Sequence, residues 1–294
     1  MTSKTLFSAE AHRGWLPWGL LSPFLCIAFV AMSLLGTSPW LKSLGLEDSS
    51  GDPIGLTGVY AFLLIPFAAM GLLIVAWVRL VERRPLSTVG LTGPAPARTL
   101  FGGILIGAVM IMGLVAAVGG LGGYEVAGPG RALASPRVMG SIGLLLLCFV
   151  VQAGVEELLF RGWLLSAVTR KLGLPIGVLL TSLVFTFLHW SPNQYWLITV
   201  SSFAFSAFAC AWAIRARNIW GVMGWHIGWN WLLSIGFGLP VTGLMIDLPP
   251  LLVHLVPQGP DSLTGGAEGP EGSWVCSLLF VIGVAVLLLR PRKS

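Results

Sequence analysis

Three short polar patterns stand in successive apolar stretches of this chain, and they hold the residues best suited to chemistry. The patterns are Glu156-Glu157-x-x-x-Arg161, Phe185-x-x-x-His189 and His226-x-x-x-Asn230. A charged side chain at the centre of a bilayer costs about 2.5–3.5 kcal/mol on insertion scales. A chain keeps such groups where they face a protein interior, pair with one another or take part in a reaction.

The first pattern contains two carboxylates with different surroundings. Adjacent residues of a helix point about 100° apart, so Glu156 and Glu157 cannot share one direction. Arg161 follows Glu157 by four residues and therefore lies on the same helix face. We expect Glu157 to pair with Arg161 and Glu156 to face another partner.

The other two patterns can reach the depth of Glu156. Counting about 1.5 Å of rise per residue from the turn at 170–171 places His189, at the end of its apolar stretch, close to the height of Glu156. His226 and Asn230 are four residues apart, so both project from one helix face. One carboxylate and three neutral polar groups can thus converge on one point inside the membrane.

This set of groups is typical of the hydrolysis of an acyl bond. A carboxylate beside an imidazole can act as general base on a water molecule. Two donors on one rigid helix face can stabilise a developing oxyanion, at about 10²–10³ in rate per donor. The sequence contains neither Gly-x-Ser-x-Gly nor His-Glu-x-x-His, which excludes a serine-hydrolase elbow and a conventional zincin site.

The elements that must position these groups are membrane helices. Of the 294 residues, 55% are hydrophobic and only 10% are charged, whereas soluble domains carry about 25% charged residues. We therefore predict an all-α, polytopic integral membrane protein with eight transmembrane helices. The helices are expected at 15–36, 56–78, 100–121, 138–165, 174–190, 197–214, 218–238 and 274–289.

The basic residues predict the orientation of these helices. With the N-terminus inside, the inner face holds 14 of the 17 Lys and Arg residues, Arg161 included. The outer loops hold eight of the twelve acidic residues. Because Lys and Arg favour the cytoplasmic side, both termini are predicted to be cytoplasmic. The net charge of +5 thus reflects basic residues that are gathered in the cytoplasmic loops. We therefore expect no nucleic acid as partner.

The chain divides into three predicted regions. Residues 1–137 hold three transmembrane helices and a basic cytoplasmic loop, and residues 138–236 hold helices four to seven with all three patterns. Residues 237–294 hold an outer Pro/Gly-rich loop and the last helix. Glu268 and Glu271 in that loop are expected to be solvated charges, as carboxylates usually are.

The three patterns, in this order and on membrane helices, resemble those of the CPBP family. This family comprises CAAX proteases and bacteriocin-processing enzymes and includes the type II CAAX prenyl endopeptidases. The resemblance, over about residues 138–236, implies an intramembrane glutamate endopeptidase. It implies that Glu156 and His189 activate the water and that His226 and Asn230 form the oxyanion hole. The residues given a supporting role are Glu157, Arg161 and Phe185.

The resemblance also bears on cofactor and substrate. Two His and one Glu can bind Zn²⁺, but Asn is a poor zinc ligand, so we favour an enzyme without metal or other cofactor. The expected partner is the lipid bilayer and a membrane-anchored protein or peptide, cleaved near its end. Peptide leaders and C-terminal membrane anchors both fit. The Gly-, Ala-, Leu- and Pro-rich composition suggests a bacterial cytoplasmic (inner) membrane.

Two other functions compete with the peptidase. A proton-coupled transporter using Glu156 as carrier predicts an internal repeat, and none is evident in the sequence. A non-catalytic scaffold or immunity protein on the same fold would tolerate loss of Glu156 or His189, yet both residues are present.

Overall fold

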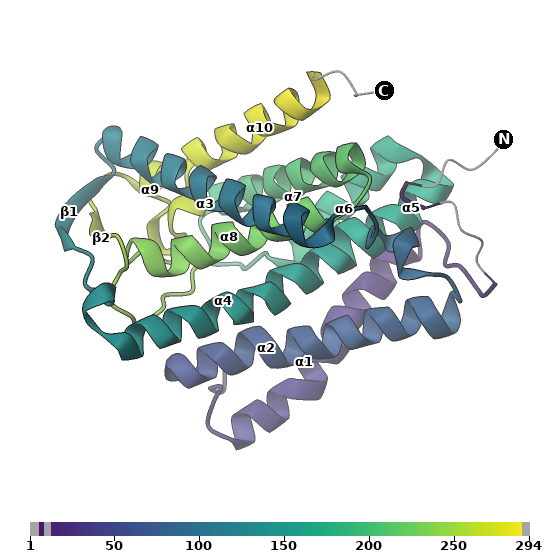
Figure 1. Cartoon of the computed structure of the whole chain (residues 1–294), viewed down its shortest axis with the longest axis horizontal. Coiled ribbons are helices and arrows are strands. Elements are labelled where there is room, and N and C mark those ends of the chain that lie inside the picture. The colour runs from purple at the N-terminus through teal and green to yellow at the C-terminus, as the bar shows by residue number, and fades with distance from the viewer. Residues whose placement is uncertain (1–5, 9–12, 290–294) are drawn as a thin grey trace.

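The computed structural model describes residues 6–8 and 13–289, which form mainly helices (Figure 1). The longer helices are α1 (Ser22–Ser43), α2 (Gly55–Ala76), α3 (Pro96–Gly120), α4 (Pro136–Glu157), α5 (Leu165–Leu172), α6 (Leu174–Leu188), α7 (Trp196–Ala216), α8 (Trp220–Gly236) and α10 (Trp274–Leu289). The short elements are the strands β1 (Tyr124–Pro129) and β2 (Val253–Pro257), the helix α9 (Asp261–Thr264), the π-helical turns η1 (Trp77–Val81) and η4 (Leu158–Leu164), and the 3₁₀ turns η2 (Leu86–Val89), η3 (Ala132–Ala134), η5 (Gly266–Glu268) and η6 (Pro270–Gly272).

Each predicted apolar run overlaps with a helix. Among the described residues, five helical segments are long and apolar enough to cross a membrane, namely Ser22–Ser43, Gly55–Val81, Pro96–Gly120, Pro136–Leu172 and Trp196–Ala216. The helices α6, α8 and α10 are shorter, with 15, 17 and 16 residues. The prediction of a mainly helical membrane protein agrees with this architecture.

The first helix lies seven residues further along the chain than predicted. α1 begins at Ser22, with Pro23 in its first turn, where the missing N–H of proline removes no intrahelical hydrogen bond. It continues through Pro39 to Ser43, although the apolar run ends at Gly36. The hydroxyl of Thr37 donates to the carbonyl of Ser33 at 2.7 Å, so the helix itself satisfies this polar side chain.

The strict all-α prediction is wrong in one detail, because β1 and β2 form a small antiparallel sheet. Tyr124 pairs with Pro257 and Pro129 with Val253. The strands are separated by more than 120 residues, so no local sequence pattern predicts their pairing. The Pro/Gly-rich region 237–273 is therefore not a plain loop, since it contains β2, α9 and two 3₁₀ turns.

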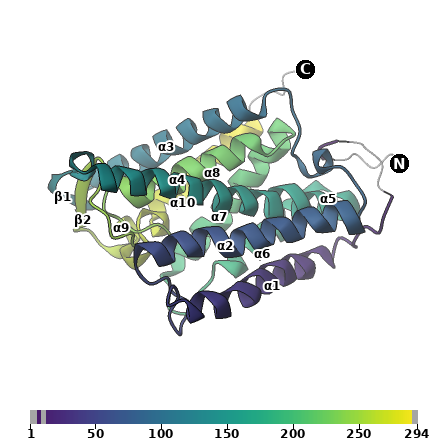
Figure 2. The same cartoon turned by 60° about the horizontal axis from the view of Figure 1, so that its bottom comes forward.

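The two ends of the molecule differ in the secondary-structure elements that they contain. Figures 1 and 2 both place β1, β2 and α9 at one end and α5 at the other. The helices run between these ends. α8 lies in the interior of this bundle, and almost all of its residues are buried.

Glycines bring α3 into backbone contact with α8. A Cβ atom on Gly107 would lie 2.1 Å from the carbonyl oxygen of Trp225, and one on Gly228 would lie 2.1 Å from that of Ile104. Gly103 and Gly224 are packed just as tightly. Such spacing of small residues is the usual way for membrane helices to approach closely. It fixes the position of α8, which carries the third polar pattern, His226 and Asn230.

Candidate active site

Glu156 and Glu157 occupy the last turn of α4, directly before the π-helical turn η4. All residues of η4 are buried, including Arg161. Single π-turns inside α-helices are frequent at functional sites. Arg161 thus lies inside the protein. The prediction that counted it among the charges of the inner face is wrong.

Glu157 joins two helices through one carboxylate oxygen. Its Oε1 accepts a hydrogen bond from Arg161 Nη1 at 3.0 Å, with both side chains fully buried. The same oxygen lies 2.9 Å from Nδ1 of His226 on α8. The pairing with Arg161 agrees with the i, i+4 expectation, whereas the contact with His226 was not predicted. Since an ionised carboxylate only accepts, Nδ1 of His226 donates, which leaves Nε2 facing the cavity.

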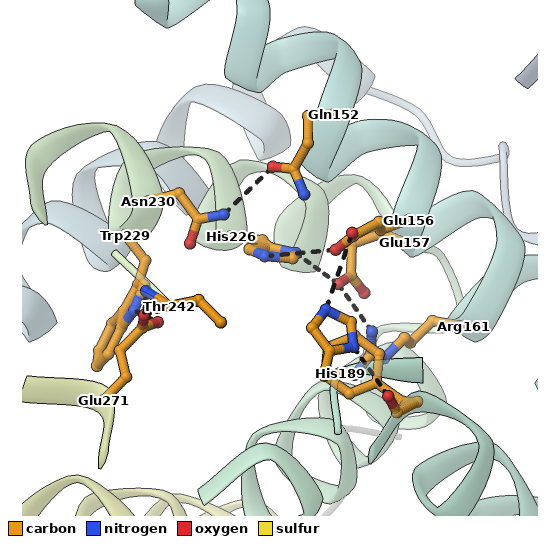
Figure 3. A network of polar contacts seen from close by, with 11 residues as sticks. Gln152, Glu156, Glu157, Arg161, His189, His226, Trp229, Asn230, Thr242 and Glu271 are labelled. Carbon is orange, nitrogen blue, oxygen red and sulfur yellow. Dashed lines mark hydrogen bonds and ion pairs between the residues drawn. The ribbon is translucent and has the colours of Figure 1, made fainter. Parts of the chain in front are cut away.

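Glu156 faces two imidazole rings at a distance just beyond direct hydrogen bonding. Its Oε1 lies 4.0 Å from Nε2 of His189, and its Oε2 lies 3.8 Å from Nε2 of His226. Oε2 is buried and has no hydrogen-bond partner among the described residues. Figure 3 shows the three side chains pointing toward one another from α4, the end of α6 and α8. One water molecule can bridge separations of this size.

His189 is oriented by the end of its own helix. It caps α6, and its Nδ1 lies 2.8 Å from the carbonyl oxygen of Phe185. A carbonyl only accepts, so Nδ1 carries the proton and Nε2 is the acceptor in the neutral ring. The ring of Phe185 stacks on His189 at 4.1 Å, and the guanidinium carbon of Arg161 lies 4.6 Å from the same ring centroid. Phe185 therefore packs between the histidine and the arginine.

Asn230 projects from the same face of α8 as His226 and meets a residue that the patterns do not include. Its Nδ2 donates to Oε1 of Gln152 at 3.3 Å. Gln152 precedes Glu156 by four residues and so shares its face of α4. This spacing is the signal in the sequence that could have identified Gln152.

These side chains line a cavity of about 240 Å³. Its polar lining residues are Gln152, Glu156, His189, Ser201, Ser202, His226, Asn230, Thr242 and Glu271. Its apolar wall is formed by Phe62, Leu63, Phe67, Phe149, Phe185, Ile198, Phe205 and Phe280. The structure thus brings the four residues predicted as catalytic to one cavity, with an aromatic surface beside them.

The expectation that Glu271 is a solvated charge is wrong. Its side chain is buried, and its Oε1 accepts a hydrogen bond from Trp229 Nε1 at 2.7 Å. Its Oε2 accepts from the backbone N–H of Thr242 at 2.7 Å and from the Thr242 hydroxyl at 2.8 Å. Glu271, Thr242 and Trp229 appear together in Figure 3. The turn η6 carries Glu271 against α8, a placement that depends on tertiary packing.

Glu268 differs from Glu271, because it is only partly buried. Burial raises the pKa of the Glu268 carboxyl, and the charge of Glu271 raises it further. Glu268 is therefore not a freely solvated charge either.

The donor atoms of the site include two imidazole rings and a carboxylate, which are common metal ligands. Over residues 6–8 and 13–289, no group of three or more His, Cys, Asp or Glu side chains is arranged to hold a metal ion. The fourth member of the predicted catalytic set is the amide of Asn230, which contributes hydrogen-bond donors rather than a strong zinc ligand.

Comparison with known proteins locates this site in a family domain. A family model described as "Type II CAAX prenyl endopeptidase Rce1-like" matches residues 139–232, which include every predicted site residue. No curated protein and no solved structure gives a significant match. The family match agrees with the resemblance carried by the three polar patterns: residues 139–232 form a domain of the Rce1-like family of type II CAAX prenyl endopeptidases.

Proposed function

We propose that the protein is an intramembrane endopeptidase of the glutamate type. The observation that carries the proposal is a buried carboxylate, Glu156, placed between two imidazole nitrogens at 3.8 and 4.0 Å in a cavity with an apolar wall. The Rce1-like family match supports peptidase activity, and the catalytic assignment adds to it.

Glu156 and His189 activate the attacking water. Nδ1 of His189 holds its proton on the Phe185 carbonyl, so Nε2 is an acceptor facing Glu156. Glu156 takes a proton from a water held between the two groups, and the oxygen attacks the carbonyl carbon of the scissile bond. As the C–N bond of the tetrahedral intermediate breaks, that proton passes to the leaving amine nitrogen.

His226 and Asn230 stabilise the oxyanion of the intermediate. In this proposal His226 acts as an imidazolium: its Nδ1–H donates to Glu157, and its Nε2–H points into the cavity beside Glu156. The Asn230 amide has two N–H donors, of which one is directed to Gln152. Each such donor contributes about 10²–10³ in rate.

Glu157 and Arg161 act as supporting residues in this proposal. The two side chains form a buried ion pair, and the Glu157 carboxylate also orients His226. Phe185 supports the site from the other side through its stacking on His189. The proposed chemistry uses no metal and no cofactor, because its base, its acceptor and both oxyanion donors come from the chain.

The proposed substrate is a membrane-anchored protein or peptide cleaved near its end. A catalytic carboxylate in the interior of a helical bundle acts only on a bond that is delivered there, next to a lipid anchor or the end of a transmembrane segment. Peptide leaders and C-terminal anchors meet this condition. The proposed location is a bacterial cytoplasmic membrane, with both termini on the cytoplasmic side.

The test is mass-spectrometric profiling of peptide N- and C-termini in membranes. Cells producing the wild-type protein are compared with cells producing Glu156→Gln at matched abundance. Glu125→Gln, which changes an exposed carboxylate on β1, is the control. We expect a set of termini that is lost in Glu156→Gln and retained in Glu125→Gln. Unchanged termini with all three proteins folded would refute the peptidase in favour of a scaffold or a transporter.

A further inference from the structure

The cavity leads from the catalytic groups toward one end of the molecule. Beyond the catalytic groups, its wall includes Val241, Thr242 and Leu244 from the segment after α8, and Glu271 from η6. Thr242 is exposed to solvent, so this part of the wall reaches the surface. These segments belong to the end that carries β1, β2 and α9 in Figures 1 and 2.

The opposite direction is closed. None of the described residues that line the cavity comes from the connections α2–α3, α5–α6 or α7–α8, which lie at the other end. Directly after Glu156 and Glu157, the π-turn η4 fills this direction with Arg161, Trp163 and Leu164, all fully buried. Of the two ends of the molecule, the β1–β2 end is therefore the one toward which the lining of the cavity continues.

The distribution of charge identifies this end as the outer one. In the described part of the chain, the end that carries α5 has one carboxylate, Glu82, and nine Lys or Arg side chains, namely Arg13, Arg79, Arg83, Arg84, Arg98, Arg170, Lys171, Arg215 and Arg217. The β1–β2 end carries three, Lys42, Arg131 and Arg137, together with eight carboxylates, Glu47, Asp48, Asp52, Glu125, Asp247, Asp261, Glu268 and Glu271. The excess of basic residues marks the cytoplasmic side.

Hydrogen bonds hold the cavity wall at the outer end in a defined conformation. Val241 and Leu244 form an isolated antiparallel bridge, and Thr242 between them has a left-handed φ of 46°. A threonine in this conformation is strained, and here the Glu271 carboxylate holds both its N–H and its hydroxyl. We refer to residues 241–244 as the mouth loop.

We propose that the cavity takes its substrate from the outer face, past the mouth loop, so that the substrate class is the outer segment adjoining a membrane anchor. This inference rests on the proposed peptidase function. Asn230 lies six residues before the end of α8, or about 9 Å below it at 1.5 Å per residue. About three residues of extended peptide, at about 3.3 Å each, span that depth. The aromatic wall then contacts the apolar side chains nearest the anchor.

The first experiment labels introduced cysteines in intact cells. All four native cysteines are fully buried, so a new exposed thiol is the reactive one. Met245→Cys lies beside the mouth loop, where Met245 is 55% exposed, and Ala97→Cys lies at the exposed start of α3 at the basic end. We expect a membrane-impermeant maleimide to label Met245→Cys in intact cells and Ala97→Cys only after permeabilisation. The reverse pattern would overturn the proposal.

The second experiment follows cleavage in the same cells by terminal profiling. We expect the Glu156-dependent termini to arise from bonds on the outer side of the substrate's anchor. A bulky impermeant maleimide on Met245→Cys should abolish them, while treated wild-type protein should keep them. Cleavage at inner-side bonds, or unchanged cleavage by fully labelled Met245→Cys, would overturn the proposal. Outer labelling of Met245→Cys without any Glu156-dependent terminus would refute the peptidase and still support the orientation of the cavity.

Discussion

Glu156 and Glu157 are neighbours in the chain, yet the structure gives them different partners. Glu157 is fully buried and accepts from Arg161 and His226, whereas Glu156 reaches the cavity and faces His189 and His226 without a direct hydrogen bond. The 100° rotation between adjacent helix positions produces this division. One carboxylate is consequently available to a water molecule, and the other holds the site together.

Asn230 provides the first test at the scale of a residue. Asn230→Ala should lower kcat by about 10²–10³ and leave a measurable rate, because one oxyanion donor is lost while the base remains. Gln152→Ala should lower kcat by about tenfold at most, since it removes only the acceptor that orients the amide. The rates are measured on a substrate found by terminal profiling. An equal loss in both variants would contradict these separate roles.

Glu157 provides a test of stability. Glu157→Ala leaves the buried Arg161 guanidinium without its carboxylate, and breaking a buried ion pair costs about 3–5 kcal/mol. We expect lower abundance in membrane immunoblots and a lower thermal midpoint in detergent. The double variant Glu157→Leu with Arg161→Leu should recover abundance, because neither charge is then left unpaired. Wild-type abundance of Glu157→Ala would show that the pair is not needed for folding.

At the scale of elements, the position of α8 decides whether the site assembles. The glycines at its interface with α3 allow backbone contact, and the residues of α8 that reach the cavity are set by that contact. The turn η6 has a comparable role at the β1–β2 end, since its Glu271 accepts hydrogen bonds from both α8 and the mouth loop.

Gly107 tests the contact between α3 and α8. Gly107→Ala places a methyl group 2.1 Å from the Trp225 carbonyl oxygen, so the helices must separate, at a cost of about 1–3 kcal/mol. We expect a lower thermal midpoint and reduced cleavage, because His226 follows Trp225 on α8. Gly113→Ala, on the same helix with no atom within 4 Å of the added methyl, is the matched control and should behave as wild type.

Glu271 tests the attachment of the mouth loop. Glu271→Gln replaces a carboxylate that accepts three hydrogen bonds with an amide that presents N–H groups to one of the same donors. Amide hydrogen exchange in residues 239–244 should become about tenfold faster, as expected for loss of a charged hydrogen bond. Glu268→Gln, which keeps these contacts, is the control. Equal exchange in wild type and Glu271→Gln would show that the loop is held by other contacts.

At the scale of the whole molecule, charge separates the two ends, and the cavity leads to the acidic one. In the described part of the chain, the basic residues are unevenly distributed between the two ends, and the residues that line the cavity continue toward one of them. Together these two observations underlie the proposal that a substrate reaches Glu156 from the outer face.

The acidic end also makes stability depend on pH. Burial, followed by the charge of Glu271, raises the pKa of Glu268 in the folded protein. A folded protein that binds the proton more tightly than the unfolded chain loses stability as pH rises from about 4.3, the unfolded value, through the raised folded value. Glu268→Gln should therefore flatten this decline in thermal midpoint, measured in detergent from acidic to neutral pH. An unchanged slope would contradict the role of Glu268.

Much of the architecture and of the candidate site follows from local sequence patterns. The apolar runs specify the helices, because each backbone hydrogen bond of a helix is made within the segment itself. The i, i+4 spacing pairs Glu157 with Arg161 and places His226 beside Asn230, since helical geometry depends on sequence separation alone. The three polar patterns also indicate the family that the comparison finds over residues 139–232.

Other features were decided only by the tertiary structure. The contacts of Glu157 with His226 and of Gln152 with Asn230, the burial of Glu271 and the pairing of β1 with β2 all join residues separated by 29 or more positions. No period within one segment encodes such contacts, because they depend on how α3, α4 and α8 pack and on where η6 is carried. The sequence alone therefore determined which groups are present and how each helix displays them. The packing of the helices decided which groups meet, and to which end the cavity leads.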